Sequence, residues 1–304
     1  ISHTFDSLTR TVKCNIDKGK KFNWALMYKI SRFAGLQVFM QSFMSGSKLI
    51  FVDITEAPSE IIRQLIISKC NALSATPTMY RKLIIGSDIM NLNLQQITLG
   101  GEICDQQLLD TIKKLFTKAR VTQVYASTEA GVGFAVNDGI AGFPESYLDD
   151  EVNGVKIKVS KNNIFFLKNN KTKYINSNTY KIPKDNDGYI DTGDKVNYID
   201  GRYYFLGRSN GAINVGGNKV HPEEVETIIK ELKEIKLVSV FGKSNPVLGQ
   251  IVIAKVVPAV NIQDKDLKSI ILRKCKDNLD GYKVPALIKI IEDIPLNQSG
   301  KIYR

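Results

Sequence analysis

Long apolar runs, cysteine and histidine are scarce in this sequence. No stretch approaches the roughly 18 consecutive apolar residues of a membrane-spanning helix, and no signal peptide precedes the first domain. We therefore expect no stable insertion into a membrane. The four cysteines and two histidines show neither metal-ligand nor redox spacing, so reduced thiols and a cytoplasmic location are expected.

Acidic residues are fewer than basic ones, and the formal net charge is +11. Such an excess of positive charge would favour binding to nucleic acid or to an anionic membrane surface. The lysines are scattered among acids, however, and the cluster Lys18-Gly19-Lys20-Lys21 is short. We interpret most of the excess as solvated surface, with a minor share serving small anionic substrates, and expect no nucleic-acid partner. With 304 residues, 43% of them hydrophobic, the chain is long enough for one large or two modest globular domains.

Hydrophobic periodicity near the beginning of the chain alternates between helix and strand. Residues 33–44 are apolar at helical spacing, and residues 48–52 have the pattern of a buried strand. This alternation predicts the α/β class, a mostly parallel sheet with helices on both faces. It continues with helices at 58–69, 78–85 and 106–116 and with strands at 72–75, 96–99 and 121–125.

The character of the sequence changes twice further along. After about residue 133, short strands separated by turns are expected at 155–159, 164–167 and 174–176. From about residue 210, a new pattern predicts a separate small α+β domain, with the boundary near the polar turn 209–211. Its expected helices are 222–232 and 264–279, and its expected strands are 237–241, 250–257 and 286–291. We therefore divide the chain into a large domain, residues 1–209, and a small domain, residues 210–304. Within the large domain, residues 1–132 would form the sheet and residues 133–209 a separate subdomain.

One polar stretch, Tyr125–Gly131, directly follows an apolar strand. The carboxyl end of a strand is where an α/β sheet usually binds its ligand. There Thr128 could meet a phosphate while Glu129 holds a hard cation such as Mg²⁺ through oxygen. Taken alone, the stretch has an equally simple interpretation as a polar turn that closes the strand.

Three later stretches agree with the binding interpretation. They are Asp187–Asp194, Gly207–Glu226 and Pro295–Arg304. In order and spacing, the four motifs resemble those of the adenylate-forming superfamily: acyl- and aryl-CoA synthetases, peptide-synthetase adenylation domains and luciferases. The resemblance covers nearly the whole chain. It implies that residues 133–209 form a small distorted β-barrel and that residues 210–304 form a mobile lid.

The resemblance also implies roles for the residues around the first motif. Thr128 would hydrogen-bond phosphate and Glu129 would bind Mg²⁺. Tyr125 would pack on adenine, together with its neighbours Ala126 and Ser127. A glycine pair after an earlier strand matches a turn that lies against adenine, although such a pair is often only a tight turn. That turn is Gly100, Gly101 and Glu102.

Later residues would complete the nucleotide site. Asp194 would accept both ribose hydroxyls, which suits a carboxylate, and Arg208 would contact ribose and phosphate, with a surface arginine as the alternative. Lys301 would reach from the lid to the reacting carboxylate and α-phosphate, with a solvated tail lysine as the alternative. Asn210 stands at the hinge of the lid, where the family usually has Asp or Lys.

Two further sets of residues concern the acid and the thiol. Gly216 and Gly217 match the strand that lines the pantetheine tunnel after the lid rotates, with Lys219 close by in the same motif. Arg32 takes the place of a histidine that is common in the acid pocket, and Gly35 follows it. A surface or phosphate-facing arginine is an equally good interpretation of Arg32.

Together these motifs predict an ATP-dependent acid–thiol ligase. It would adenylate a small carboxylic acid to acyl-AMP, release pyrophosphate, and transfer the acyl group to CoA. Two alternatives remain: an enzyme that loads a phosphopantetheine carrier protein, and a catalytically impaired nucleotide-binding relative. The glycine-rich phosphate loop of the family is not found in the sequence, which resembles the region just downstream of it. A homodimer is possible.

Overall fold

The computed structural model describes residues 3–85, 87–127, 130–152, 154–169, 183–208 and 211–295. Their contacts divide the chain into two compact units. Among the described residues, unit 1 contains 3–192 and 198–204, and unit 2 contains 193–197 and 205–295. The division into domains at residue 209 stays a prediction.

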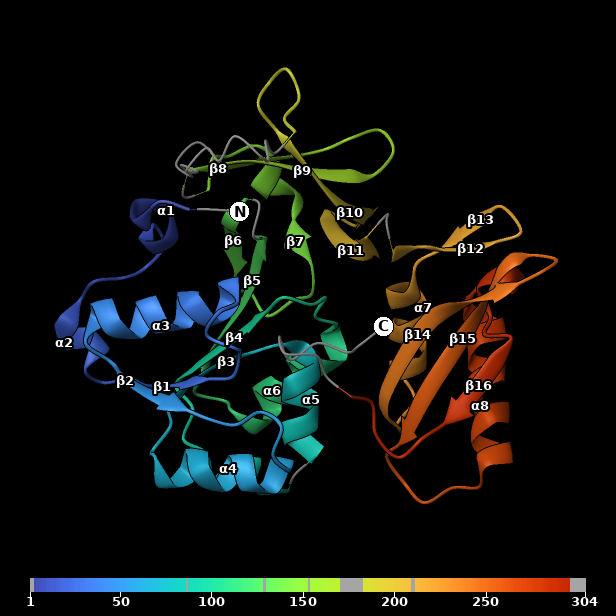
Figure 1. The fold of residues 1–304 in the computed structure, drawn as a ribbon, viewed down its shortest axis with the longest axis horizontal. Coiled ribbons are helices and arrows are strands. Elements are labelled where there is room, and N and C mark those ends of the chain that lie inside the picture. Colours follow the sequence, from blue (N-terminus) through green and yellow to red (C-terminus); the bar gives the residue numbers. More distant parts are fainter. Residues whose placement is uncertain are drawn as a thin grey trace. The chain divides into compact units, whose positions relative to one another are not determined.

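Unit 1 is built on a six-stranded sheet with the order β2-β1-β3-β4-β5-β6 (Figure 1). The first five strands are parallel and β6 runs antiparallel to β5. The predicted α/β class is therefore confirmed. The strands are β1 (Asn23–Leu26), β2 (Lys48–Phe51), β3 (Ala72–Ala75), β4 (Gln96–Gly100), β5 (Arg120–Ser127) and β6 (Gly131–Val136).

The helices of unit 1 begin and end where local chemistry directs. Pro58 occupies the first turn of α4, where its missing N–H costs nothing. The Asp105 carboxylate accepts the Leu108 N–H at 3.0 Å and caps α6. Gly46 ends α3 in the left-handed conformation, φ +68°. The helices are α1 (Phe5–Thr9), α2 (Ile16–Gly19), α3 (Phe33–Ser45), α4 (Pro58–Ile67), α5 (Pro77–Ile85) and α6 (Gln106–Leu115), with a 3₁₀ turn η1 (Ser87–Asn91).

Strand β1 was not predicted from the sequence. It lies between β2 and β3 in the sheet, although both follow it in the chain. All four residues of β3 are buried, and the Tyr80 hydroxyl of α5 donates to the Leu73 carbonyl at 2.6 Å. A fully buried tyrosine thereby keeps its polar atom paired in the core.

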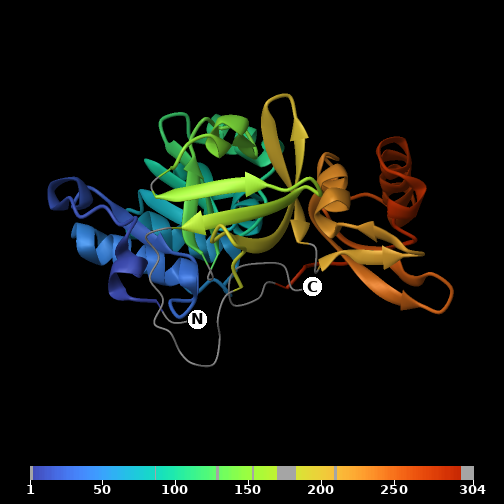
Figure 2. The same ribbon diagram turned by 90° about the horizontal axis from the view of Figure 1, so that it is seen from above.

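A second, five-stranded sheet follows, with the order β7-β11-β10-β9-β8. Figure 2 shows β8 and β9 crossing over the first sheet. The ring of Phe134 in β6 lies 5.1 Å from that of Phe143 and 6.2 Å from that of Phe165, so aromatic packing joins the two sheets. The expected strand 174–176 lies outside the described residues. The strands are β7 (Phe143–Pro144), β8 (Val155–Val159), β9 (Ile164–Asn169), β10 (Ile190–Ile199) and β11 (Arg202–Arg208), and a 3₁₀ turn η2 (Glu145–Leu148) follows β7.

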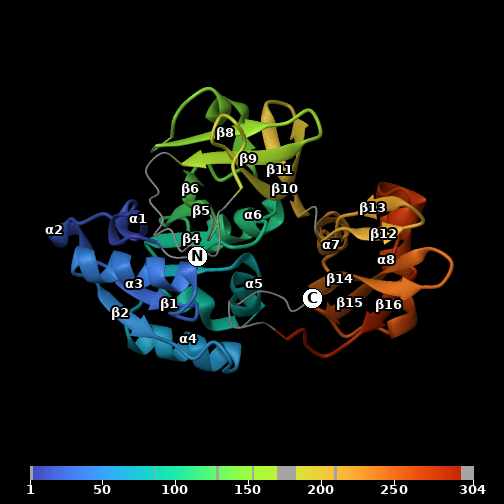
Figure 3. The same ribbon diagram turned by 45° about the horizontal axis from the view of Figure 1, so that its top comes forward.

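Unit 2 is a smaller α+β body. Its sheet has the order β13-β12-β15-β14, and β16 joins β15 in parallel (Figure 3). The Glu226 side chain on α7 is 2% exposed and its carboxyl oxygen accepts the Val240 N–H at 2.9 Å, so a buried hydrogen bond joins the helix to the sheet. The elements are β12 (Ile213–Val215), β13 (Asn218–Val220), α7 (Pro222–Lys230), β14 (Ile235–Asn245), β15 (Gly249–Pro258), α8 (Asp264–Asn278), η4 (Gly281–Lys283) and β16 (Leu287–Ile290).

Candidate nucleotide and acid site

Polar side chains gather at the carboxyl ends of β1, β3 and β4. Glu102, just after β4, accepts the Thr78 N–H at 3.0 Å with its carboxylate. That N–H lies in the first turn of α5, where the helix dipole favours a negative charge. Gly101 makes this turn possible with φ +82°. The turn predicted from the sequence is therefore present, and its carboxylate is fixed against a helix.

A buried tyrosine at the same edge was not assigned a role from the sequence. Tyr28 follows β1, is 6% exposed and hydrogen-bonds Ser74 of β3. Burial raises the pKa of its phenol, and the charge of Glu102 adds to the effect. A neutral hydroxyl thus lies beside a fixed carboxylate at the usual ligand edge. Only the strand order, which brings β1 next to β3, could reveal this grouping.

Tyr125 is held by aromatic neighbours at the end of β5. Its ring stacks on Phe134 at 5.4 Å and meets Phe165 edge-on at 5.0 Å. The pairing of β5 with β6 shifts by one residue between Tyr125 and Ala126, an irregularity that redirects side chains at a strand end. Beyond it, the Ser127 hydroxyl accepts the Ala130 N–H at 3.0 Å. Packing on Phe134 and Phe165 therefore fixes the position of the Tyr125 ring.

Asp194 and Arg208 come together in unit 2. The Arg208 Nε donates to Asp194 Oδ1 at 3.3 Å, across the hairpin of β10 and β11. The Asp194 side chain is 14% exposed and that of Arg208 is 60% exposed. The sequence assigned both residues to one nucleotide, and the structure makes them neighbours.

The expected strand position of Gly216 and Gly217 needs a correction, whereas their role in a thiol tunnel stays a prediction. Gly216 and Gly217 were expected in a strand, but they form the turn between β12 and β13, with φ +57° and +90°. The Gly216 N–H donates to the Leu248 carbonyl at 2.8 Å. These glycines are therefore required by the backbone conformation of the turn. Lys219 is exposed on β13.

The two residues proposed for the acid pocket lie at the start of α3. Arg32 is exposed and precedes the helix, whereas Gly35 is buried within its first turn. A Cβ on Gly35 would lie 2.3 Å from the Lys29 carbonyl oxygen, so close backbone packing is sufficient to explain this glycine. The pocket role of both residues stays a prediction.

Four predicted site residues lie outside the described residues, namely Thr128, Glu129, Asn210 and Lys301, and their roles stay predictions. Within the described portion of the chain, no group of three or more His, Cys, Asp or Glu side chains is arranged to hold a metal ion. No helix among the same described residues is long and apolar enough to cross a bilayer.

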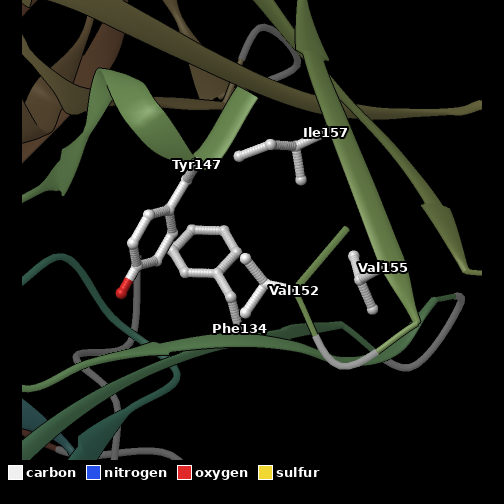
Figure 4. Close-up of a pocket in the computed structure, with 5 residues that line it drawn as sticks. All are labelled: Phe134, Tyr147, Val152, Val155 and Ile157. Atoms are coloured by element: carbon white, nitrogen blue, oxygen red, sulfur yellow. The ribbon is translucent and has the colours of Figure 1, made fainter. Parts of the chain in front are cut away.

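Figure 4 shows a hollow between β6 of the first sheet and β8 of the second that is not a ligand site. It has no room for a water-sized sphere and is enclosed by apolar side chains and one tyrosine ring. The Tyr147 hydroxyl donates to the Ala135 carbonyl at 3.1 Å. We interpret the hollow as imperfect packing. Its lining is Phe134, Tyr147, Val152, Val155 and Ile157.

Comparison with solved structures identifies the fold as that of adenylate-forming enzymes. The anthranilate CoA ligase AuaEII in complex with anthranoyl-AMP superposes with a TM-score of 0.79 at 18% identity, covering 99% of this chain and 62% of that one. The o-succinylbenzoate CoA synthetase (MenE) from Bacillus subtilis, solved with the acyl-adenylate intermediate OSB-AMP, gives 0.70 at 21% identity and covers 99% and 64%.

Sequence comparison then identifies the family. The profile of AMP-binding enzymes matches residues 1–170, and that of the AMP-binding enzyme C-terminal domain matches residues 224–301. The chain belongs to the AMP-binding enzyme family, as the motif resemblance predicted.

Two curated relatives illustrate the range of that family. A 2-succinylbenzoate–CoA ligase of Listeria monocytogenes serotype 4b (strain F2365) is 27% identical over 305 residues, covering 95% of this chain and 62% of the relative. A 3,4-dihydroxybenzoate–[aryl-carrier protein] ligase of Bacillus anthracis is 36% identical over 124 residues, covering 40% of this chain and 28% of the relative. The chain thus spans about three fifths of the length of the first of these relatives.

Proposed function

We propose that the protein to which this chain belongs is an ATP-dependent ligase that joins a carboxylic acid to CoA. The observation that carries the proposal is the Asp194–Arg208 pair, found within a chain that belongs to the AMP-binding enzymes. A mostly buried carboxylate beside an exposed guanidinium can accept two vicinal hydroxyls of a ribose while the cation meets the neighbouring phosphate. The match to the Listeria relative covers 95% of this chain, and that relative is named as a CoA ligase. Its name therefore supports the choice of reaction.

The reaction has two steps. In the first, a carboxylate oxygen attacks the α-phosphorus of ATP, and the bond to the β-phosphate oxygen breaks, giving acyl-AMP and pyrophosphate. In the second, the CoA thiol loses its proton and attacks the acyl carbon, and AMP leaves with the electrons of the broken C–O bond. The site must therefore hold negative charge, position the two reactants and exclude water.

Different residues of this chain would bind different parts of the reactants in the first step. Tyr125 would pack on the adenine, with the Gly100–Glu102 turn along its edge. Asp194 and Arg208 would hold the ribose and the α-phosphate, and Lys301 would reach the reacting oxygens. Mg²⁺ would enter with ATP as its phosphate complex, with Glu129 and Thr128 facing that complex. The metal supplies charge neutralisation at the phosphates.

The acid itself is best proposed from the relatives. The Listeria enzyme is named for 2-succinylbenzoate, an aromatic keto acid, so aromatic carboxylates come first in a substrate panel. Arg32 at the start of α3 would pair with a second anionic group on such an acid.

Transfer to a carrier protein is the second candidate. It is favoured by the Bacillus anthracis relative, whose identity of 36% is higher than that of the Listeria enzyme but extends over only 40% of this chain. The two candidates share the first step and differ only in the thiol.

Pyrophosphate exchange on the complete protein, with a panel of aromatic and aliphatic acids, tests the first step. Asp194→Asn should abolish exchange at subsaturating ATP, because an amide cannot accept both ribose hydroxyls. Asp191→Asn, three residues earlier on the same strand, is the matched control and should exchange normally. Mass spectrometry with CoA or with a phosphopantetheine carrier then identifies the thiol. A wild-type protein that exchanges with none of the acids would overturn the ligase proposal and favour a nucleotide-binding relative without activity.

A further inference from the structure

Strand β5 begins beside a hollow of about 400 Å³ in unit 1. Helix α6 ends at Leu115 and β5 begins at Arg120, so the end of the helix and the turn after it form one wall. The residues that follow β6, the antiparallel neighbour of β5, form the other wall. A hollow of this volume has room for a small molecule. We call it the α6–β5 groove, and its lining includes Lys113, Phe116, Arg120, Val121, Asn137 and Gly139.

The floor of the α6–β5 groove is apolar. Phe116 and Val121 line it, although their exposed fractions are only 7% and 8%. Both side chains are therefore fixed in the packing of unit 1 and present a small apolar surface to the groove. Such a surface can cover the hydrocarbon part of a ligand, whereas it offers nothing to a bare hydrated ion.

Two cationic side chains border this floor. Lys113 comes from the last turn of α6 and Arg120 from the first position of β5, and both are exposed. A Cβ on Gly139 would collide with the Lys113 ammonium, so that ammonium lies against the opposite wall of the groove. Among the described residues, neither cation is in an ion pair.

The nearby acidic side chains have other partners. Asp138, two residues after β6, pairs with Arg202 at 2.8 Å. Asp110, one turn before Lys113 on α6, accepts the Gln106 amide at 2.9 Å. The positive charge at the border of the groove is therefore available to a ligand.

A neutral donor joins the two cations. Asn137 Oδ1 accepts the Thr122 hydroxyl at 2.7 Å and lies 3.5 Å from Arg120 Nη2. Thr122 is 9% exposed and its hydroxyl accepts the Gln96 amide at 3.2 Å, so this chain of hydrogen bonds fixes the orientation of Asn137. Because the oxygen is used, the amide nitrogen keeps two N–H donors for a ligand. Lysine, arginine and amide together supply donors, a set that suits an anion.

The α6–β5 groove lies at the opposite end of β5 from the proposed nucleotide site. Arg120 is the first residue of β5, whereas Tyr125 lies five residues later, toward its carboxyl end. At about 3.3 Å per residue, the two Cα atoms are roughly 16 Å apart. The Gly100–Glu102 turn also lies at the carboxyl end of its strand, β4. A ligand in the groove would therefore not occupy the nucleotide site.

We propose that the α6–β5 groove binds a phosphate monoester with a compact apolar body. A phosphoryl group carries nearly two negative charges at neutral pH and three acceptor oxygens, which match the two cations and the Asn137 amide. A carboxylate has one charge and two oxygens, so it would leave one of the cations unpaired. The apolar body would cover Phe116 and Val121. This binding is additional to the proposed ligase activity and does not depend on it.

Calorimetry with phenyl phosphate on the complete protein tests this proposal. AMP is present at saturating concentration, so that the nucleotide site is filled, and the ionic strength is held constant. Lys113→Ala and Arg120→Ala should each raise the dissociation constant for phenyl phosphate roughly tenfold or more, because each removes a charged hydrogen bond. Lys114→Ala is the matched control. It removes the same charge from the next residue of α6, which is exposed and outside the groove lining, and should change the dissociation constant less than about twofold.

Two further ligands test the match of charge and shape. Inorganic phosphate and benzoate should each bind more weakly than phenyl phosphate, since the first leaves the floor uncovered and the second carries a single charge. Lys113→Arg keeps the cation and should bind phenyl phosphate nearly as well as the wild type. Thermal unfolding verifies that each variant is folded.

Three results would overturn the proposal. Absence of saturable binding at millimolar phenyl phosphate would show that the groove is not a site for this ligand. Equal losses in Lys113→Ala and Lys114→Ala would show attraction to the basic surface in general. Binding of inorganic phosphate or benzoate as tight as that of phenyl phosphate would contradict the proposed ligand. None of these results depends on pyrophosphate exchange, so failure of this proposal is distinguishable from failure of the ligase proposal.

Discussion

The ring of Tyr125 lies where a side chain on Gly133 would have to go. A Cβ added to Gly133 in β6 would be 3.0 Å from Tyr125 Cδ1 and 2.9 Å from Leu167 Cδ1. Gly133 therefore leaves room for the Tyr125 ring, which we propose packs on adenine. The sequence around Tyr125 or Gly133 does not indicate this contact. It arises from the shifted pairing of β5 and β6.

Gly133→Ala should lower the free energy of unfolding of unit 1 by about 1–3 kcal/mol, the usual range for overpacking a core. Because Tyr125 must also move, AMP should bind more weakly. Urea titration followed by exposure of the buried Cys70 thiol measures the first effect, and calorimetry with AMP measures the second. Gly100→Ala in β4, on the other side of β5, is the stability control, since its Cβ would make only an ordinary 3.4 Å contact. Equal stability of the two variants would show that the ring adapts freely.

Arg208→Ala should weaken AMP binding while leaving folding almost unchanged. The Arg208 side chain of the Asp194–Arg208 pair is 60% exposed. Exposed ion pairs add at most about 1 kcal/mol to the free energy of unfolding. A charged hydrogen bond to ligand contributes about 1.5–3 kcal/mol, so the dissociation constant for AMP should rise roughly tenfold or more. Calorimetry and thermal unfolding on the same sample separate the two effects. A large drop in melting temperature with unchanged affinity would give the pair a structural role instead.

Acidification should destabilise unit 2 through His221. Its ring is 6% exposed, and its Nδ1 has no hydrogen-bond partner in the described structure. Burial lowers the pKa of the imidazole, and the charge of Lys195 lowers it further. The pKa of His221 is lower in the folded protein than in the unfolded chain. Burial of the neutral ring therefore costs the folded state nothing above the unfolded pKa of about 6.5, and the free energy of unfolding falls as the pH drops below that value, because the unfolded chain takes up the proton.

Unfolding measured by exposure of the buried Cys275 thiol between pH 7.5 and pH 5.5 checks this expectation. His221→Gln should reduce the pH dependence in that interval. His3→Gln, which removes the other histidine from unit 1, is the control and should leave the dependence of unit 2 unchanged. If the free energy of unfolding of the wild type did not change between pH 7.5 and pH 5.5, the prediction would be wrong, because His221 would then have the same pKa in the folded and unfolded states.

Lys301→Ala in the complete protein should remove adenylation and spare thioester formation from supplied acyl-AMP. The physical reason is that the ammonium neutralises charge on the α-phosphate only while the first step proceeds. Pyrophosphate exchange and thioester assays measure the two half-reactions separately. Lys289→Ala on β16, where the lysine is exposed, is the matched control. Equal loss in both half-reactions would contradict the assignment.

Most element positions in unit 1 could be predicted because the signals are local. Helix α4 begins at Pro58, and α3 ends before Gly46, where a left-handed residue is needed. Strand β1 escaped prediction because it has only four residues, half of them partly exposed, and its place in the sheet depends on strands that come later in the chain. Gly216 and Gly217 were placed in a strand because a motif specifies residues and order but not backbone dihedral angles.

What the sequence by itself determined is the alternation of helices and strands, the order of the motifs and the family that this order implies. These properties depend on residues close together in the chain, so periodicity, caps and spacing are enough to read them. Only the tertiary structure decided that Tyr28 lies beside Ser74 and Glu102, that Arg208 reaches Asp194, and that α3 leaves Phe43 in solvent. Each of these depends on strand order or on the packing of distant segments, and burial is a property of the surroundings rather than of the residue.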